Sequence, residues 1–238
     1  YGVVRRRGTL DAVLAPQSRR PLARLARPVR IALRLAVYQM LFLDRVPVHA
    51  AVDHAVTWAR QRAGAKPAGY ANAVLRATAR QVEGLARGTE DVRRDVPRED
   101  GSAMWLVKPV FAADDAENLA ARFGMPSWLV TRWVEARGIP RTKAILQGAI
   151  GRPPLTLRAR GDGAALVAGL ESEGVEVRAL PIDAAYRVEH GPESQALRAV
   201  ARGDAWVQDM TAQRVAPLLA PRPGGRLLDL CAAPGGKT

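Results

Sequence analysis

The sequence is poor in cysteine and contains no long apolar run. Its single cysteine, Cys231, excludes an internal disulfide and fits a reducing compartment. No stretch approaches the roughly 18 apolar residues that a membrane-spanning helix requires, and no signal-peptide pattern is present. The remaining composition, 48% hydrophobic and 25% charged, is typical of a soluble globular protein. We therefore expect a cytoplasmic protein without membrane association.

Acidic residues are few in the first part of the chain. Residues 1–100 contain 19 basic and 9 acidic side chains, whereas residues 101–238 contain 17 basic and 14 acidic ones. The formal net charge of the whole chain is +13. A basic first half favours a polyanionic partner, because arginine–phosphate contacts release counterions. An arginine-rich proteome would give the same composition. The residues expected to contact phosphate, with a merely solvated face as the alternative, are Arg5, Arg6, Arg7, Arg30 and Arg34.

Residues 1–88 predict a bundle of helices. The segment 29–43 places apolar side chains at helical spacing, and Pro47 ends the turn that follows it. A second helix ends near Gly64, and a third continues through Val82, with helix expected to about residue 85. Connections this short between helices of this length indicate a compact domain.

Residues 89–150 predict a linker followed by helices. The charged, proline-bounded stretch from Thr89 to Pro109 is typical of a linker. Asp114 with Glu117 suits the start of a helix that ends at Gly124, and Ser127 suits the start of the next, which breaks near residue 138.

Residues 151–208 change to the period of strands. Their order is β-α-β-β-α-β, the split pattern of ferredoxin-like modules, which RNA-recognition domains share. Aromatic residues make up only 5% of the chain, and we find no pair of the kind that stacks bases in those domains. The pattern therefore predicts a small α+β module without establishing RNA contact.

Residues 209–238 predict a helix, a buried strand at 226–230 and a glycine loop. A nucleotide-phosphate loop would need glycine where Cys231 stands, and the dinucleotide pattern needs more glycines than Gly235 and Gly236. The hypothesis that this segment is the P-loop of a nucleotidase is therefore disfavoured. Because the chain begins at Tyr1 and stops after this loop, we expect a fragment.

Residues 227–238, Leu-Leu-Asp-Leu-Cys-Ala-Ala-Pro-Gly-Gly-Lys-Thr, resemble the S-adenosylmethionine loop of RNA cytosine-5 methyltransferases. Residues 35–47 and 70–76 resemble the NusB-like domain that precedes the catalytic domain in the bacterial 16S ribosomal RNA methyltransferase family of the Sun (RsmB) type. Short segments at 126–129, 152–155 and 207–209 are similar to that family's connecting regions.

This resemblance implies a multidomain fold: an all-α NusB-like bundle, an α+β connecting region, and the first strand of a truncated Rossmann-like methyltransferase domain from residue 209. It implies S-adenosylmethionine-dependent methylation of C5 of a cytosine in 16S ribosomal RNA, by a monomer without a metal. The residues that would line the cofactor are Cys231, Ala232, Ala233, Pro234, Gly235, Gly236 and Lys237.

The family's catalytic cysteine attacks the pyrimidine ring and makes its C5 nucleophilic. It belongs to later motifs, beyond residue 238, so the resemblance implies no catalytic residue here and an inactive chain. The alternative is a non-catalytic NusB-like RNA-binding transcription or assembly factor, which would have no use for a cofactor loop.

Five further side chains are candidate ligand contacts. Trp128 and Trp133 could stack on bases, but their spacing favours one in the core and one partly exposed. His49 and His54 lack the partners of a metal site and are expected to be solvated. Asn72 is expected to cap or bridge helices.

Overall fold

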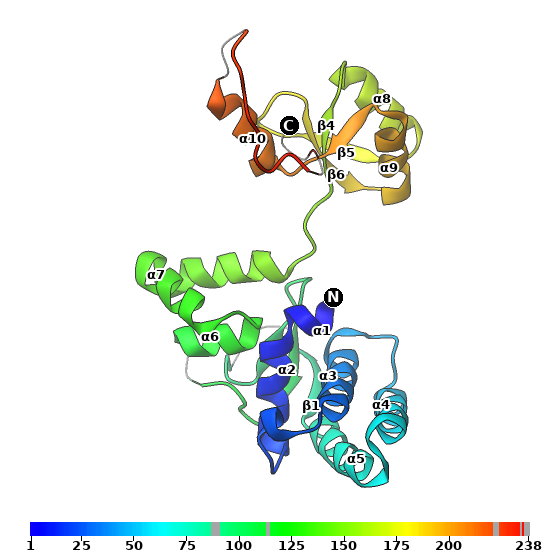
Figure 1. The fold of residues 1–238 in the computed structure, drawn as a ribbon, viewed down its shortest axis with the longest axis vertical. Helices are drawn as coiled ribbons and strands as arrows, with labels where there is room; N and C mark the ends of the chain where they lie inside the picture. Colours follow the sequence, from blue (N-terminus) through cyan, green and yellow to red (C-terminus); the bar gives the residue numbers. More distant parts are fainter. Residues whose placement is uncertain (87–90, 113–114, 221–223, 234, 236–238) are drawn as a thin grey trace. The chain divides into compact units, whose positions relative to one another are not determined.

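The computed structural model describes residues 1–86, 91–112, 115–220, 224–233 and 235. The chain divides into two compact units, Tyr1–Arg152 and Pro153–Thr238 (Figure 1).

The first unit is built on a helical bundle whose helices follow the expected apolar stripes. The helix expected at 29–43 spans Arg27–Phe42, and in it Leu33, Val37 and Leu41 have no exposed surface. Between this helix and the next, Pro47 stands immediately before the first helical residue, as expected. The helical elements are α1 (Gly2–Arg5), α2 (Arg7–Leu14), 3-10 turns at Ala15–Gln17 and Leu22–Arg24, α3 (Arg27–Phe42), α4 (Val48–Ala63) and α5 (Ala65–Ala79).

A small antiparallel sheet completes this core. Its strands are β1 (Val82–Ala86), β2 (Asp95–Pro97) and β3 (Ala103–Leu106), in the order β1-β3-β2. Their apolar side chains join the hydrophobic core of the helices, including Val96 and Leu106, which are fully buried.

The sheet corrects two expectations: helix to about residue 85, and a linker from residue 89 to 109. The third helix ends at Ala79, and Val82 lies in a strand. The charged residues of this stretch suggested a solvent-exposed linker. However, Asp95 lies within the stretch and is fully buried against the guanidinium of Arg122. A charge that is neutralised inside the core looks, in the sequence, like a charge in a linker.

Two helices close the first unit, α6 (Ala116–Phe123) and α7 (Ser127–Ile150). The Asp115 carboxylate accepts from the Asn118 amide at 2.8 Å and caps α6, while Asp114, expected in that role, lies outside the described residues. Gly124, at φ 71°, ends α6, and Gly138, at φ 74°, breaks α7, both where expected. Among the helices described, none is long and apolar enough to cross a lipid bilayer.

The second unit contains the predicted β-α-β-β-α-β order. Its sheet is antiparallel, with strand order β5-β6-β4-β7, and helices α8 and α9 pack on it through a core that includes Leu157, Leu170 and Ala199. The elements are β4 (Thr156–Ala159), α8 (Gly163–Ser172), β5 (Glu176–Ala179), β6 (Ala185–His190), α9 (Glu193–Arg202), β7 (Ala205–Val207) and α10 (Met210–Leu219).

The strand expected at 226–230 is not formed. These residues have no regular secondary structure, and Leu227, Leu228 and Leu230 are 65%, 80% and 86% exposed. A strand needs neighbours for its backbone N–H and C=O groups, and among the described residues none pairs with this segment. The described fold is thus a helical region with two antiparallel sheets, and a Rossmann-like sheet is not among its described elements.

Candidate nucleic-acid interface and cofactor segment

The segment resembling a cofactor loop is only partly described. Cys231, Ala232, Ala233 and Gly235 are exposed, while the others expected to bind cofactor, Pro234, Gly236 and Lys237, lie outside the described residues. The Cys231 amide donates to the Asp229 carboxylate at 2.9 Å, which makes a tight turn.

Gly235 has the geometry that only glycine adopts readily. Its φ is 91°, and a Cβ added there would meet no atom within 4 Å. The described residues of the segment, all exposed, do not enclose a ligand by themselves. They form at most one wall of a cofactor site.

A basic groove lies between α4 and α5 in the first unit. Its volume is about 890 Å³, its floor includes Val52 and Val56, and three arginines line it: Arg60, Arg76 and Arg80. Among the described residues, no carboxylate lies within 4.0 Å of a nitrogen of these three guanidinium groups. Unpaired arginines over an apolar floor are suited to phosphates with bases or riboses beneath them.

Two residues that the sequence offered as candidate ligand contacts, Asn72 and His49, line this groove. Asn72 accepts from Nε of Arg76 at 3.1 Å, one helical turn away, and so orients that arginine. His49 lines the groove together with Asp53. Within the described parts of the chain, no group of three or more His, Cys, Asp or Glu side chains could hold a metal.

A second basic cleft lies where the segment after α2 meets α5. Its volume is about 390 Å³, and Arg20, Arg24, Lys66 and Tyr70 line it without any acidic residue among the described ones. The Tyr70 hydroxyl is 2.9 Å from the Ser18 hydroxyl, and the Arg20 guanidinium lies 5.9 Å from the centre of the tyrosine ring. Both basic clefts therefore involve α5.

Most of the arginines that the sequence suggested as phosphate contacts form hydrogen bonds within the protein. Arg6 is 4% exposed, donates to the Pro97 carbonyl and lies over the Phe42 ring at 4.8 Å, and burial lowers its pKa to about 10. Arg34 makes two hydrogen bonds to Asp11, at 2.7 and 2.8 Å. Arg6 is therefore inaccessible to an RNA phosphate, and the charge of Arg34 is already paired with Asp11.

The other three arginines differ from one another. Arg5 donates to the Ala149 carbonyl at 2.6 Å and Arg30 to the Ala23 carbonyl at 2.9 Å, while Arg7 is 70% exposed at its side chain. Arg7 also has an acidic neighbour, because its Nε lies 4.0 Å from an Asp11 carboxylate oxygen. The sequence shows where positive charge is, but not which side chains the fold uses internally.

The two tryptophans behave as expected. Trp133 is half-buried against the core of α6 and α7, and Trp128 is 67% exposed. His54 is exposed on α4.

Comparison with known proteins finds similarity in sequence and in fold. Residues 1–80 match the NusB family. Along its whole length, the chain is 30% identical to the probable ribosomal RNA small subunit methyltransferase B of Synechocystis sp. and of Bacillus subtilis, and 33% identical to ribosomal RNA small subunit methyltransferase B of Xanthomonas campestris.

The chain spans about half the length of these curated relatives: 49%, 48% and 47% respectively. Among solved structures, the crystal structure titled PH0851 aligns with 99% of this chain, and the aligned part is 48% of the PH0851 chain. The TM-score is 0.63 and the sequence identity is 20%, which shows similarity of fold alone. Residues 1–80 are therefore similar to the NusB family, and the chain is similar from end to end to bacterial ribosomal RNA small subunit methyltransferase B, as its motifs indicated.

Proposed function

We propose that the protein containing this chain methylates small-subunit ribosomal RNA and that this chain supplies RNA-binding surface. The observation that carries the proposal is the 30–33% identity across the whole chain to relatives named for that activity. The activity is proposed for a protein of the relatives' length, because this chain spans about half of it.

The finer proposal is transfer to C5 of a cytosine from S-adenosylmethionine, which supplies the methyl group. It rests on the resemblance of residues 227–238 to that cofactor's loop in RNA cytosine-5 methyltransferases. In this proposal, residues 231–237 form one wall of the site, and the methyltransferase domain begins near residue 209. The nucleophile is a cysteine other than Cys231, so the 238-residue chain does not turn over alone.

Two observations support this role for the segment. Gly235, at φ 91° with open space beside it, allows a ligand to approach the backbone. Leu227, Leu228 and Leu230 are apolar and exposed, and burial between neighbouring strands would remove that surface from water. We propose that they form a buried strand when the rest of the domain is present.

RNA binding is proposed for the first unit, through the groove lined by Arg60, Arg76 and Arg80. These side chains have no acidic partner among the described residues, so their charge is available to phosphates. We further propose that the protein acts in the cytoplasm as a monomer.

The NusB match at residues 1–80 alone would also fit a non-catalytic RNA-binding factor. Calorimetry on the protein of the relatives' length separates these readings. We expect it to bind S-adenosylmethionine and to bind ATP with magnesium weakly or not at all. Gly235→Val should weaken cofactor binding by tenfold or more, since valine is strained at φ 91°, and should leave RNA binding unchanged.

Cys231→Ala is the matched control, because that position needs only a small residue, and it should keep most of the cofactor affinity. Binding of RNA without any response to S-adenosylmethionine would favour the non-catalytic factor. Tight ATP binding would favour a P-loop instead.

A further inference from the structure

The sheet of the second unit has one face covered by helices and one face rich in arginine. Leu157, Ala159 and Ala205 point to the side of α8 and α9, where they share a hydrophobic core with both helices. Because side chains alternate along a strand, Arg158 and Trp206 point to the opposite side.

The register of the strands gathers cations on that opposite side. Arg158 of β4 pairs directly with Trp206 of β7, and Arg160, which follows the end of β4, lies over the Trp206 ring. On the neighbouring strands, Arg187 of β6 pairs with Arg178 of β5. We call Arg158, Arg160, Arg178, Arg187 and Trp206 the Arg–Trp face.

Within the described part of the chain, the two arginines nearest Trp206 have no acidic partner. The Arg160 guanidinium lies 4.8 Å from the centre of the Trp206 ring, and no carboxylate among the described residues lies within 4.0 Å of a nitrogen of Arg158 or Arg160. By contrast, Arg178 and Arg187 share Glu189, at 2.7 and 2.8 Å. Among the described residues, the four arginines of this face have ion pairs with Glu189 alone, so the face is positive.

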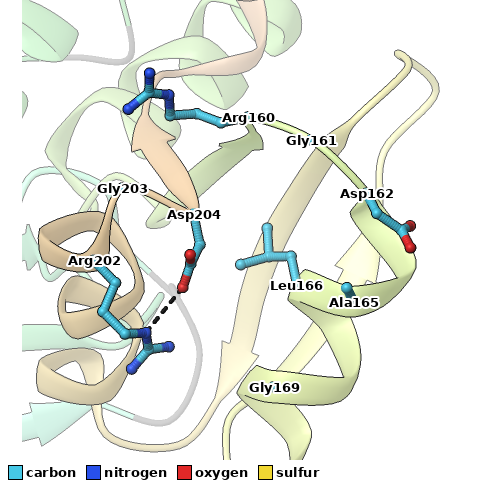
Figure 2. A pocket seen from close by; sticks show the side chains of 9 residues that line it. All are labelled: Arg160, Gly161, Asp162, Ala165, Leu166, Gly169, Arg202, Gly203 and Asp204. Carbon is cyan, nitrogen blue, oxygen red and sulfur yellow. Dashed lines mark hydrogen bonds and ion pairs between the residues drawn. The ribbon is translucent and has the colours of Figure 1, made fainter.

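The Arg160 end of this face borders a pocket of about 470 Å³ (Figure 2). Figure 2 shows the Arg160 side chain directed away from Asp162. Across the pocket, Arg202 is neutralised by Asp204 and by Glu173, both at 2.9 Å. The available positive charge beside this pocket is therefore on Arg160.

Trp206 is 46% exposed although it is large and apolar. An exposed aromatic ring flanked by unpaired arginines is suited to a nucleobase stacked on the ring and phosphates held by the guanidinium groups. Duplex RNA keeps its bases stacked inside the helix, so only unpaired nucleotides fit this arrangement.

We infer that the Arg–Trp face binds single-stranded RNA, with Trp206 stacking on a base and Arg158 and Arg160 contacting its flanking phosphates. The inference rests on the proposed function, in which RNA is the substrate, and adds a second RNA contact outside the NusB-family domain.

The test measures binding of the 238-residue chain to a fluorescent, unstructured pyrimidine RNA of about ten nucleotides, by anisotropy at several salt concentrations. Trp206→Ala should weaken binding at least about fivefold, the lower end of what a base–aromatic stack contributes, and Trp206→Phe should retain most of the affinity. Arg158→Ala with Arg160→Ala should reduce the salt slope by about 1.4, or about 0.7 per lost phosphate contact on a single strand.

Matched controls lie on α9, on the other side of the sheet. Leu197 is 48% exposed and Arg198 is exposed, so Leu197→Ala and Arg198→Ala remove similar groups and should not change binding. Photo-crosslinking of the unsubstituted chain with 4-thiouridine RNA needs no variant to fold, and should label the peptide that contains Trp206.

The outcomes separate this inference from the proposed function. If substitutions in the groove of Arg60, Arg76 and Arg80 weaken binding while those on the Arg–Trp face do not, and no crosslink reaches the Trp206 peptide, only this inference is overturned. If the unsubstituted chain does not bind RNA even at low salt, the proposed RNA-binding function is overturned as well.

Discussion

Arg122 donates to Asp95 inside the first unit, where the two side chains are 1% and 0% exposed. Burial raises the pKa of Asp95 above its usual value, against the opposing effect of the Arg122 charge. The pair joins β2 to α6, so one buried contact holds the sheet of this unit to the helix that follows it.

Arg122→Ala should destabilise the chain by about 3–5 kcal/mol at pH 7, because it leaves the Asp95 carboxylate buried without its partner. The double variant Arg122→Met with Asp95→Val removes both charges and should recover most of that loss. Urea unfolding followed by circular dichroism gives the free energies.

The sign of the pH effect is fixed by the raised pKa. A carboxyl whose pKa is higher in the folded than in the unfolded chain stabilises the fold below its unfolded pKa, and that contribution is lost as pH rises through the folded pKa. The deficit of Arg122→Ala should therefore shrink toward pH 4, where Asp95 can take up a proton. A deficit independent of pH, or one that the double variant leaves unchanged, would contradict the assignment.

At the scale of helices and strands, the proposed RNA-binding groove requires that α4 and α5 pack against each other. Arg60 stands on α4, Arg76 on α5, and Arg80 directly after it, and the groove exists only because the two helices pack.

Replacing Arg60, Arg76 and Arg80 with alanine should weaken binding of ribosomal RNA by the 238-residue chain and lower the slope of log K against log salt by about 2–3, since up to three phosphate contacts are lost. The control replaces Arg132, Arg137 and Arg141, three exposed arginines of α7, and changes the net charge equally. Equal slopes for the two triple variants would mean that only overall charge matters.

Local patterns predicted the elements whose signals are local. Apolar stripes located α3, α4 and α5, and Gly124 and Gly138 marked a helix end and a helix break, because each needs a positive φ that glycine adopts without strain.

The short strands β2 and β3 were missed, because three or four residues give little periodicity and a buried ion pair placed charge among them. The groove and the Arg–Trp face were missed for another reason. Arg158 meets Trp206, nearly 50 positions later in the sequence, only through strand register, which a single sequence does not encode in any local pattern.

At the scale of the whole molecule, the first unit matches the NusB family over residues 1–80, and the second unit ends in a segment resembling a cofactor loop. The motifs resemble that methyltransferase family, and the comparisons agree with a NusB match over residues 1–80 and 30–33% identity along the chain. The contacts of the cofactor residues are a proposal. The exposed leucines at 227, 228 and 230 are the structural sign that this segment has apolar surface to bury.

The most direct test of the account is methyl transfer by the purified protein of the relatives' length. The substrate is an unmodified transcript of small-subunit ribosomal RNA, with methyl-labelled S-adenosylmethionine as donor and bisulfite sequencing to locate the product. The account predicts label in the RNA and protection of a cytosine from bisulfite conversion, as methylation at C5 requires. RNA that is bound but never labelled, or label on an atom other than C5 of cytosine, would contradict it.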